Sequence, residues 1–248
     1  MIELNKPIKR IILPGVKTDY IENSGYSNNL FEQKKVIQIL EEDLKKISEY
    51  VEPNEKNFST YSLKLYELFI KASIEFENMC KQILLDNKYD KKITKLDIKD
   101  YYKINTLMCL DRYSCSINLI PDKNFIPFEN WSKNHVLKWY QDYNKVKHNR
   151  TNNFKMANLE NVLLSISALR ILLYAQYGNF SLDNTLSFDT IKMGAEDSEN
   201  DNDYLYLNHS LFLIKKPSES DYKYKYNFKW DVIKEETDCI EKFDFNQI

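Results

Sequence analysis

The most apolar stretch of the chain, residues 154–177, constrains the fold more than any other feature. Its apolar residues recur at steps of three and four, the spacing of one face of a helix. They are Leu159, Val162, Leu163, Ile166, Leu169, Leu172 and Leu173. Gly178 follows the stretch directly, and glycine suits the position that ends a helix. We therefore predict a central core helix, which other helices must cover.

Four further segments supply the covering helices. Helical spacing of apolar residues predicts helices over about residues 30–51 and 59–85, a weaker one over 96–107, and another over 132–149. The chain has only 4 Gly and 6 Pro among 248 residues, which favours long regular elements over turn-rich β architecture.

Alternation of apolar and polar residues predicts a smaller β component. Residues 109–120 are expected to form a short hairpin or extended loop. Residues 204–214 and 222–230 also alternate, and Pro217 lies between them, as in a hairpin connection. The acidic segment 194–203 is expected to be a mobile loop.

These patterns predict a mainly α protein, a helical bundle with a small C-terminal β region. We expect an irregular lead-in over residues 1–28, a helical bundle domain over 29–179, and a β appendage with the acidic loop over 180–248.

The composition of the chain limits the partners and the cellular compartment that we expect. A formal net charge of −2 gives no global attraction to nucleic acid or membrane, so an anionic partner must meet a local basic patch. The 4 cysteines show no CxxC spacing, which argues against a zinc site and favours reduced thiols. The N-terminal sequence lacks the apolar core of a signal peptide. We expect a cytoplasmic protein that neither inserts into a membrane nor needs a metal or other cofactor.

Chemistry is expected at one polar segment, residues 143–150 (YNKVKHNR). Glycine-rich phosphate loops and the common hydrolase motifs are absent from the sequence. Of the three histidines, His135 is expected at the surface and His209 within a strand. His148 is different, because it lies among amide and cationic side chains that suit acid–base chemistry on a phosphate.

The segment places several polar side chains together. On a helix, Tyr140, Asn144 and His148 fall at four-residue steps and share a face. Three cations crowd the same helix end, namely Lys145, Lys147 and Arg150. The same residues also suit an ordinary polar helix terminus, where cations complement the helix dipole.

Residues 143–148 resemble the motif of the HEPN superfamily, a group of helical domains that often act as metal-independent ribonucleases. The family motif has Arg, a polar residue such as Asn, a short spacer and His. Here Asn144 and His148 match, whereas Tyr143 stands in place of Arg. The resemblance covers roughly residues 59–178.

The resemblance implies a homodimer that acts on RNA, of the kind found in bacterial toxin–antitoxin or phage-defence systems. It implies catalytic roles for His148, Arg150 and Asn144, with Arg150 supplying the cation that Tyr143 does not. The expected substrate-binding residues are Lys147, Lys145, Tyr143 and Tyr140. An earlier helix is expected to supply a supporting carboxylate, Glu77 or else Glu75. The alternative is a non-catalytic helical module that binds RNA or a protein partner, such as an antitoxin.

Three aromatic features have simpler interpretations. Trp131 and Trp139 are expected in the core. The alternating Tyr and Lys residues of 222–229 suit either an edge strand protected by lysine or a platform for single-stranded RNA.

Overall fold

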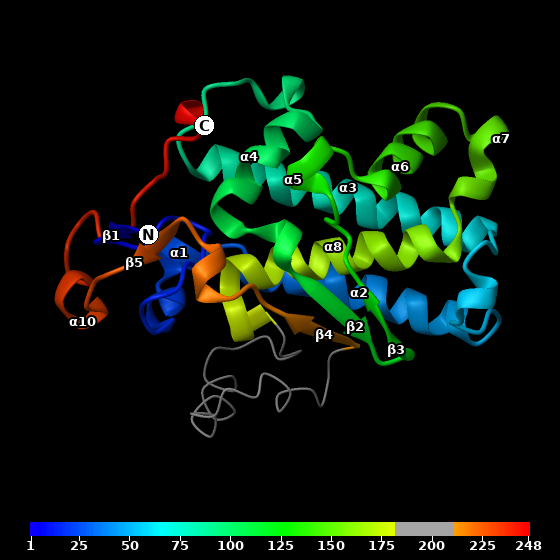
Figure 1. Cartoon of the computed structure of the whole chain (residues 1–248), viewed down its shortest axis with the longest axis horizontal. Coiled ribbons are helices and arrows are strands. Elements are labelled where there is room, and N and C mark those ends of the chain that lie inside the picture. Colours follow the sequence, from blue (N-terminus) through cyan, green and yellow to red (C-terminus); the bar gives the residue numbers. More distant parts are fainter. Residues whose placement is uncertain (182–210) are drawn as a thin grey trace.

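The protein is mainly helical, with a small β region, as the sequence predicts (Figure 1). This computed structural model describes residues 1–181 and 211–248. His209, the acidic segment 194–203 and most of the strand expected over 204–214 lie outside the described residues.

Three long helices form the centre of the bundle: α2 (Leu30–Ser48), α3 (Leu63–Asp86) and α8 (Leu159–Tyr177). Every residue of α8 except Glu160 and Leu164 is buried, which confirms the predicted core helix. Its termini follow the expected chemistry. The Asn158 side chain accepts a hydrogen bond from the Asn161 amide at 3.0 Å, and Gly178 ends the helix with a φ of 54°.

The helix α8 has the length and the apolar composition of a membrane-spanning helix. In the described part of the chain, Leu159–Ser181 is long and apolar enough to cross a bilayer, but 89% of its most apolar window is buried inside the protein. A buried core helix of a soluble protein has this composition, because it must match apolar neighbours on all sides.

Six shorter α-helices are present in the described chain. They are α1 (Ser24–Ser27), α4 (Ile98–Met108), α5 (Trp131–Asn134), α6 (Lys138–His148), α7 (Arg150–Asn153) and α10 (Trp230–Ile233). The helix predicted over 132–149 is wrong in one respect, because α5 and α6 divide it. His135 has a φ of 57° and its amide donates to the Trp131 carbonyl, so the chain leaves the helical path there. Trp131 and Trp139 are buried, as expected.

Two ion pairs, each made by a buried arginine, connect distant parts of the fold. Arg170 of α8 pairs with Glu41 of α2 and also donates to the Ser181 carbonyl at 3.0 Å. Arg10 pairs with Asp86 at the end of α3 and donates to the Tyr177 hydroxyl at 2.6 Å. All four cysteines are buried and free.

The strands form two small sheets rather than a C-terminal hairpin. β2 (Ser114–Ile117) pairs with β3 (Ile120–Phe125), so a hairpin forms near the expected segment 109–120. β4 (Phe212–Lys215) joins the other edge of β2. β5 (Tyr224–Tyr226) instead pairs in parallel with β1 (Ile2–Leu4). The expected pairing of the two C-terminal strands is therefore wrong.

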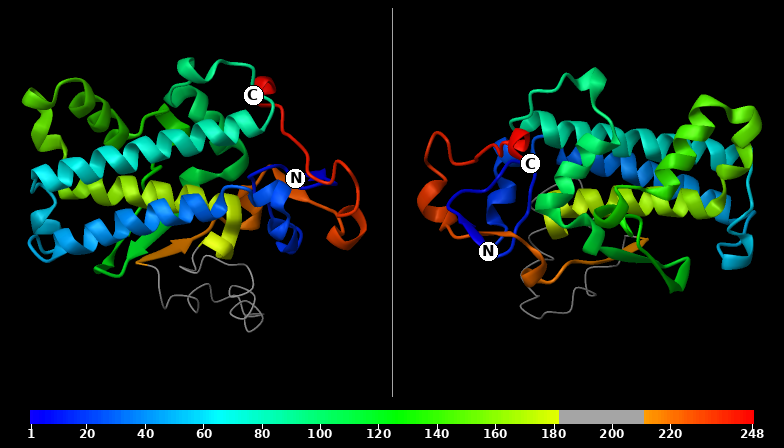
Figure 2. Two further views of the ribbon diagram at one scale, coloured as in Figure 1. Left: turned by 180° about the vertical axis from the view of Figure 1, so that it is seen from behind. Right: turned by 45° about the horizontal axis from the view of Figure 1, so that its top comes forward.

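The lead-in explains where β5 goes. The Tyr226 hydroxyl accepts a hydrogen bond from the Ile8 amide at 2.8 Å and donates to the Ile11 carbonyl at 2.6 Å. A Cβ atom on Gly15 would lie 2.2 Å from the Tyr226 carbonyl oxygen, so only glycine permits this approach. The N-terminal segment and β5 thus hold each other at one end of the bundle, where both termini lie (Figure 2).

Candidate functional site

The polar segment 143–150 forms a corner between α6 and α7. α6 ends at His148, and the Asn149 side chain accepts a hydrogen bond from the Asn152 amide at 3.3 Å to begin α7. The Asn153 amide group donates to the carbonyls of Lys145 at 3.2 Å and Asn149 at 2.9 Å. These side chains satisfy backbone groups that a helix end leaves free, so the chain turns sharply here.

His148 and Asn144 occupy the outer part of this corner. The His148 side chain is exposed and that of Asn144 is half-buried. Neither side chain has a hydrogen-bond partner among the described residues, so both remain open to a ligand. Tyr140 lies one turn before Asn144 on α6 and is buried. The helix face that Tyr140, Asn144 and His148 share therefore runs from the interior to the surface.

Glu77 of α3 lies beneath α6 and gathers three side chains around its carboxylate. The Tyr140 hydroxyl donates to Glu77 Oε1 at 2.8 Å. The Nζ atoms of Lys147 and Lys81 each lie 3.6 Å from a Glu77 oxygen. Burial and the nearby Glu77 charge raise the pKa of Tyr140, so its hydroxyl remains a donor. The expected proximity of Glu77 to the segment is present, through Tyr140 and Lys147.

Tyr143, which the expected motif places where an arginine would stand, points inward. Its side chain is fully buried and its ring packs edge-on against Phe69, with 6.2 Å between ring centroids. Lys147 Nζ lies 5.0 Å from the centre of the Tyr143 ring. Burial raises the pKa of Tyr143, which therefore stays neutral. In this position the Tyr143 ring packs in the core. A ligand that arrives from solvent would contact the exposed residues around Tyr143 instead.

Arg150 is held by aromatic rings instead of by an acid. Its guanidinium carbon lies 4.7 Å from the centre of the Tyr66 ring and 5.0 Å from that of Phe154. Such cation–π contacts hold the guanidinium beside the two rings, and no acceptor within the described residues takes its N–H groups, which can therefore bind a phosphate. No carboxylate within the described residues pairs with Arg150, so its charge is not neutralised by the protein.

Glu77 and Arg150 belong to different parts of the site. Arg150 stacks on Tyr66, and Glu77 lies eleven residues further along α3. At 1.5 Å per residue, this separation is about 16 Å along the helix. The geometry of one chain therefore brings Glu77 to Lys147 and Tyr140, but does not bring it to Arg150.

Asp142 is a residue of the site that the sequence analysis did not identify. It is buried, forms ion pairs with Lys138 and with Lys145 (3.3 Å), and accepts a hydrogen bond from Asn161 Nδ2 at 3.3 Å. Lys145 is therefore partly neutralised, unlike Arg150. The spacing of Lys138 and Asp142, four residues apart on one helix, is a signal that could have revealed this contact.

The described part of the site is a basic, partly aromatic surface with an available imidazole. Within residues 1–181 and 211–248, no group of three or more His, Cys, Asp or Glu side chains could hold a metal ion. Comparison of this chain with protein-family models, with curated proteins and with solved structures found no match. The chemistry of the corner itself must therefore carry any functional argument.

Proposed function

We propose that the corner between α6 and α7 binds RNA and acts as a HEPN-like, metal-independent ribonuclease. The single observation that carries this proposal is the exposed His148 imidazole, which has no partner in the described chain and lies two residues from the unneutralised Arg150. An available imidazole beside a fixed guanidinium suits proton transfer next to a phosphate.

The proposed reaction uses the RNA as its own nucleophile. His148 takes the proton of a ribose 2′-hydroxyl, and the resulting 2′-oxygen attacks the adjacent phosphorus. The P–O5′ bond breaks, leaving a 2′,3′-cyclic phosphate and a 5′-hydroxyl end that receives a proton. Arg150 stabilises the charge that develops on the phosphate oxygens, and Asn144 orients the nucleotide. Lys147 and Lys145 attract the backbone.

Two copies of the chain fit this chemistry better than one. Arg150 is turned toward Tyr66 and Phe154, and no contact among the described residues joins it to the His148 side chain. A second protomer could present its own His148 and Arg150 to the same phosphate. The homodimer, the cytoplasmic setting, the toxin or phage-defence role and an antitoxin partner follow from the HEPN resemblance and belong to this proposal.

The direct test is cleavage of single-stranded RNA by the purified protein in the presence of EDTA. His148→Asn should abolish cleavage, whereas the matched change His135→Asn should preserve it. His135 is also exposed, and asparagine tolerates its left-handed backbone. Equal cleavage by the two variants, or none by the wild type, would reject the nuclease.

A non-catalytic binding module is the second candidate, and the burial of Tyr143 favours it. The family arginine position points into the core here, so the motif lacks its usual cation at that place. This alternative predicts that RNA or a protein partner binds the corner without turnover. His148→Asn would then leave binding almost unchanged, whereas Arg150→Ala would weaken the binding of RNA.

A further inference from the structure

We propose that the outer face of α2 and α3 is a self-association surface, to which a second copy of this chain binds. In the rear view, α2 and α3 lie on either side of α8, which is visible between them (Figure 2, left). α8 packs on their inner side, and α6 contacts α3 elsewhere through Glu77 and Phe69. The groove on this face shares the first turns of α3 with Tyr66, the contact of Arg150, but neither Tyr66 nor Arg150 lines it.

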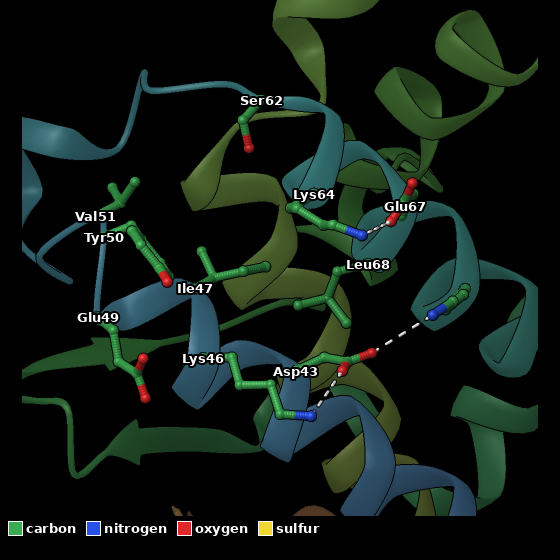
Figure 3. Close-up of a pocket in the computed structure, with 11 residues that line it drawn as sticks. Asp43, Lys46, Ile47, Glu49, Tyr50, Val51, Ser62, Lys64, Glu67 and Leu68 are labelled. Atoms are coloured by element: carbon green, nitrogen blue, oxygen red, sulfur yellow. Dashed lines mark hydrogen bonds and ion pairs between the residues drawn. The ribbon is translucent and has the colours of Figure 1, made fainter.

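A groove of about 570 Å³ lies between the last turns of α2 and the first turns of α3 (Figure 3). Its floor is apolar and includes Ile47, Val51 and Leu68. Concave, largely apolar sites of this size accept one or two large side chains of a partner. The groove can therefore receive a projecting aromatic residue.

Tyr50 is such a residue, and it lines the same groove. Its side chain is 87% exposed, the largest exposed fraction among the large hydrophobic residues in the described chain. Tyrosine often anchors protein interfaces, because it buries a large apolar ring and keeps a polar hydroxyl. Leu63, at the start of α3, adds a second apolar side chain that is 49% exposed. A protein partner would remove both from water.

The apolar character continues along both helices. Ile39 lies one turn before Asp43 on α2, and Ile74 lies about one turn after Lys71 on α3. Asp43 and Lys71 face each other across the two helices at 3.4 Å, so the two isoleucines follow on the same side of that pair. They are 48% and 38% exposed. From Ile39 to Ser48, the last residue of α2, the surface extends about 14 Å along the helix, and Tyr50 follows two residues later.

The charges around the groove indicate which partner fits. Equal numbers of cations and anions line it, and most are already paired: Lys64 with Glu67 at 2.9 Å, and Asp43 with Lys71 and with Lys46 at 3.8 Å. A balanced surface offers little attraction to RNA or another polyanion. In a twofold dimer, however, the same patch must face itself, so it needs both signs of charge. We therefore assign the groove to a second copy of this chain, with each Tyr50 entering the partner's groove.

The test is the oligomeric state of the full chain, measured by sedimentation velocity between 1 and 100 µM, on the order of the range in which modest interfaces dissociate. The wild type should sediment as a dimer at the upper concentrations. Tyr50→Asp and Leu63→Asp should each raise the dimer dissociation constant at least about tenfold. Both positions are solvent-exposed, and circular dichroism would verify that each variant folds.

Val232→Asp is the matched control, because Val232 is also an exposed apolar residue (68%) but lies on α10, outside the groove. It should leave the dissociation constant unchanged. A wild type that remains monomeric overturns the proposal. So does a dimer that tolerates both Tyr50→Asp and Leu63→Asp, because it must then form through another face.

This interface differs from one that would bring two His148 corners to the same phosphate, so its outcomes are independent of the ribonuclease proposal. A dimer that requires Tyr50 but does not cleave RNA supports the self-association surface and rejects the nuclease. Cleavage that survives Tyr50→Asp in a monomeric protein supports the corner chemistry, but shows that this dimer is not needed for it.

Discussion

The Tyr140 hydroxyl donates a hydrogen bond to the Glu77 carboxylate across 2.8 Å, and so joins α6 to α3 beneath the His148 corner. Both groups are shielded from solvent: Tyr140 is 6% exposed and the Glu77 side chain 13%. A carboxylate in such a place needs partners, because burial of an unpaired charge is costly. Tyr140, Lys81 and Lys147 provide them, which fixes the position of α6 relative to the bundle.

Tyr140→Phe should therefore lower the free energy of unfolding by about 1–2 kcal/mol, the range for a shielded hydrogen bond to a charged group. Urea denaturation monitored by circular dichroism would measure the change. Tyr61→Phe is a suitable control, because Tyr61 is 51% exposed and its hydroxyl has no hydrogen-bond partner in the described chain. Equal effects of the two substitutions would show that the Glu77 contact adds no stability.

Asp100 should give the protein an acid-sensitive stability. Burial alone would raise the pKa of this carboxyl, but hydrogen bonds from Lys91 and Tyr89, both at 2.6 Å, and from the Asp97 amide at 2.8 Å outweigh it and lower the pKa. A lowered folded-state pKa means that the ionised form stabilises the fold. This contribution is fully present above the unfolded pKa of about 3.9 and is lost as the pH falls through the folded pKa.

Asp100→Asn should consequently destabilise the protein near pH 7 and lose this difference from the wild type as the pH falls below about 4. Urea titrations at several pH values would show the two free energies of unfolding converging. Asp231→Asn provides the comparison, because the Asp231 carboxylate is 92% exposed. A constant gap between Asp100→Asn and the wild type at all pH values would exclude the proposed linkage.

Local sequence patterns were sufficient to predict the long helices, but not short ones such as α1, which lies in the lead-in expected to be irregular. The apolar spacing of 159–173 predicted α8, and Gly178 marked its end, because both depend on residues close in the chain. The break at His135 was not predictable in this way. Its left-handed backbone is unusual for histidine, and helical spacing continues on both sides. The partners of β4 and β5 also escaped prediction, since alternation shows that a strand exists but not which distant strand it joins.

The sequence also predicted part of the candidate site, namely the features that depend on residues close in the chain. The four-residue spacing placed Asn144 and His148 on one face, and the contact between Glu77 and α6 agrees with the expected neighbourhood. Their roles remain predictions. The inward turn of Tyr143 and the stacking of Arg150 on Tyr66 depend on α3 and could not be derived from the segment itself. Contacts between helices require the packed structure.

The buried pair of Glu41 and Arg170 offers a test of how α2 is held against α8. The two side chains are 3% and 2% exposed, so each charge depends on the other. Arg170→Met should lower the free energy of unfolding by about 3–5 kcal/mol, because it leaves Glu41 buried without its partner. The double variant Glu41→Leu/Arg170→Met should recover much of this loss.

Recovery should be incomplete, because the Ser181 carbonyl still loses the hydrogen bond that Arg170 donates at 3.0 Å. Urea denaturation of the two single variants and the double variant would give the coupling between the residues. If the double variant lost as much as the sum of the two single losses, the pair would not interact energetically.

The stacked guanidinium of Arg150 gives the most specific prediction for RNA binding. If Arg150 contacts one phosphate of a single strand, Arg150→Ala should weaken binding and reduce the slope of log affinity against log salt by about 0.7. Arg150→Lys should retain that slope but still bind less tightly, because lysine cannot hold a phosphate with two parallel hydrogen bonds. Fluorescence anisotropy with a labelled single-stranded RNA between 50 and 200 mM salt, on the order of the usual range, measures both quantities. Arg112→Ala is the matched control, since the Arg112 side chain is 61% exposed and belongs to the short helical turn Leu110–Arg112, which is not part of the corner. An identical loss of slope in both arginine variants would mean that the RNA follows general surface charge rather than the Arg150 site.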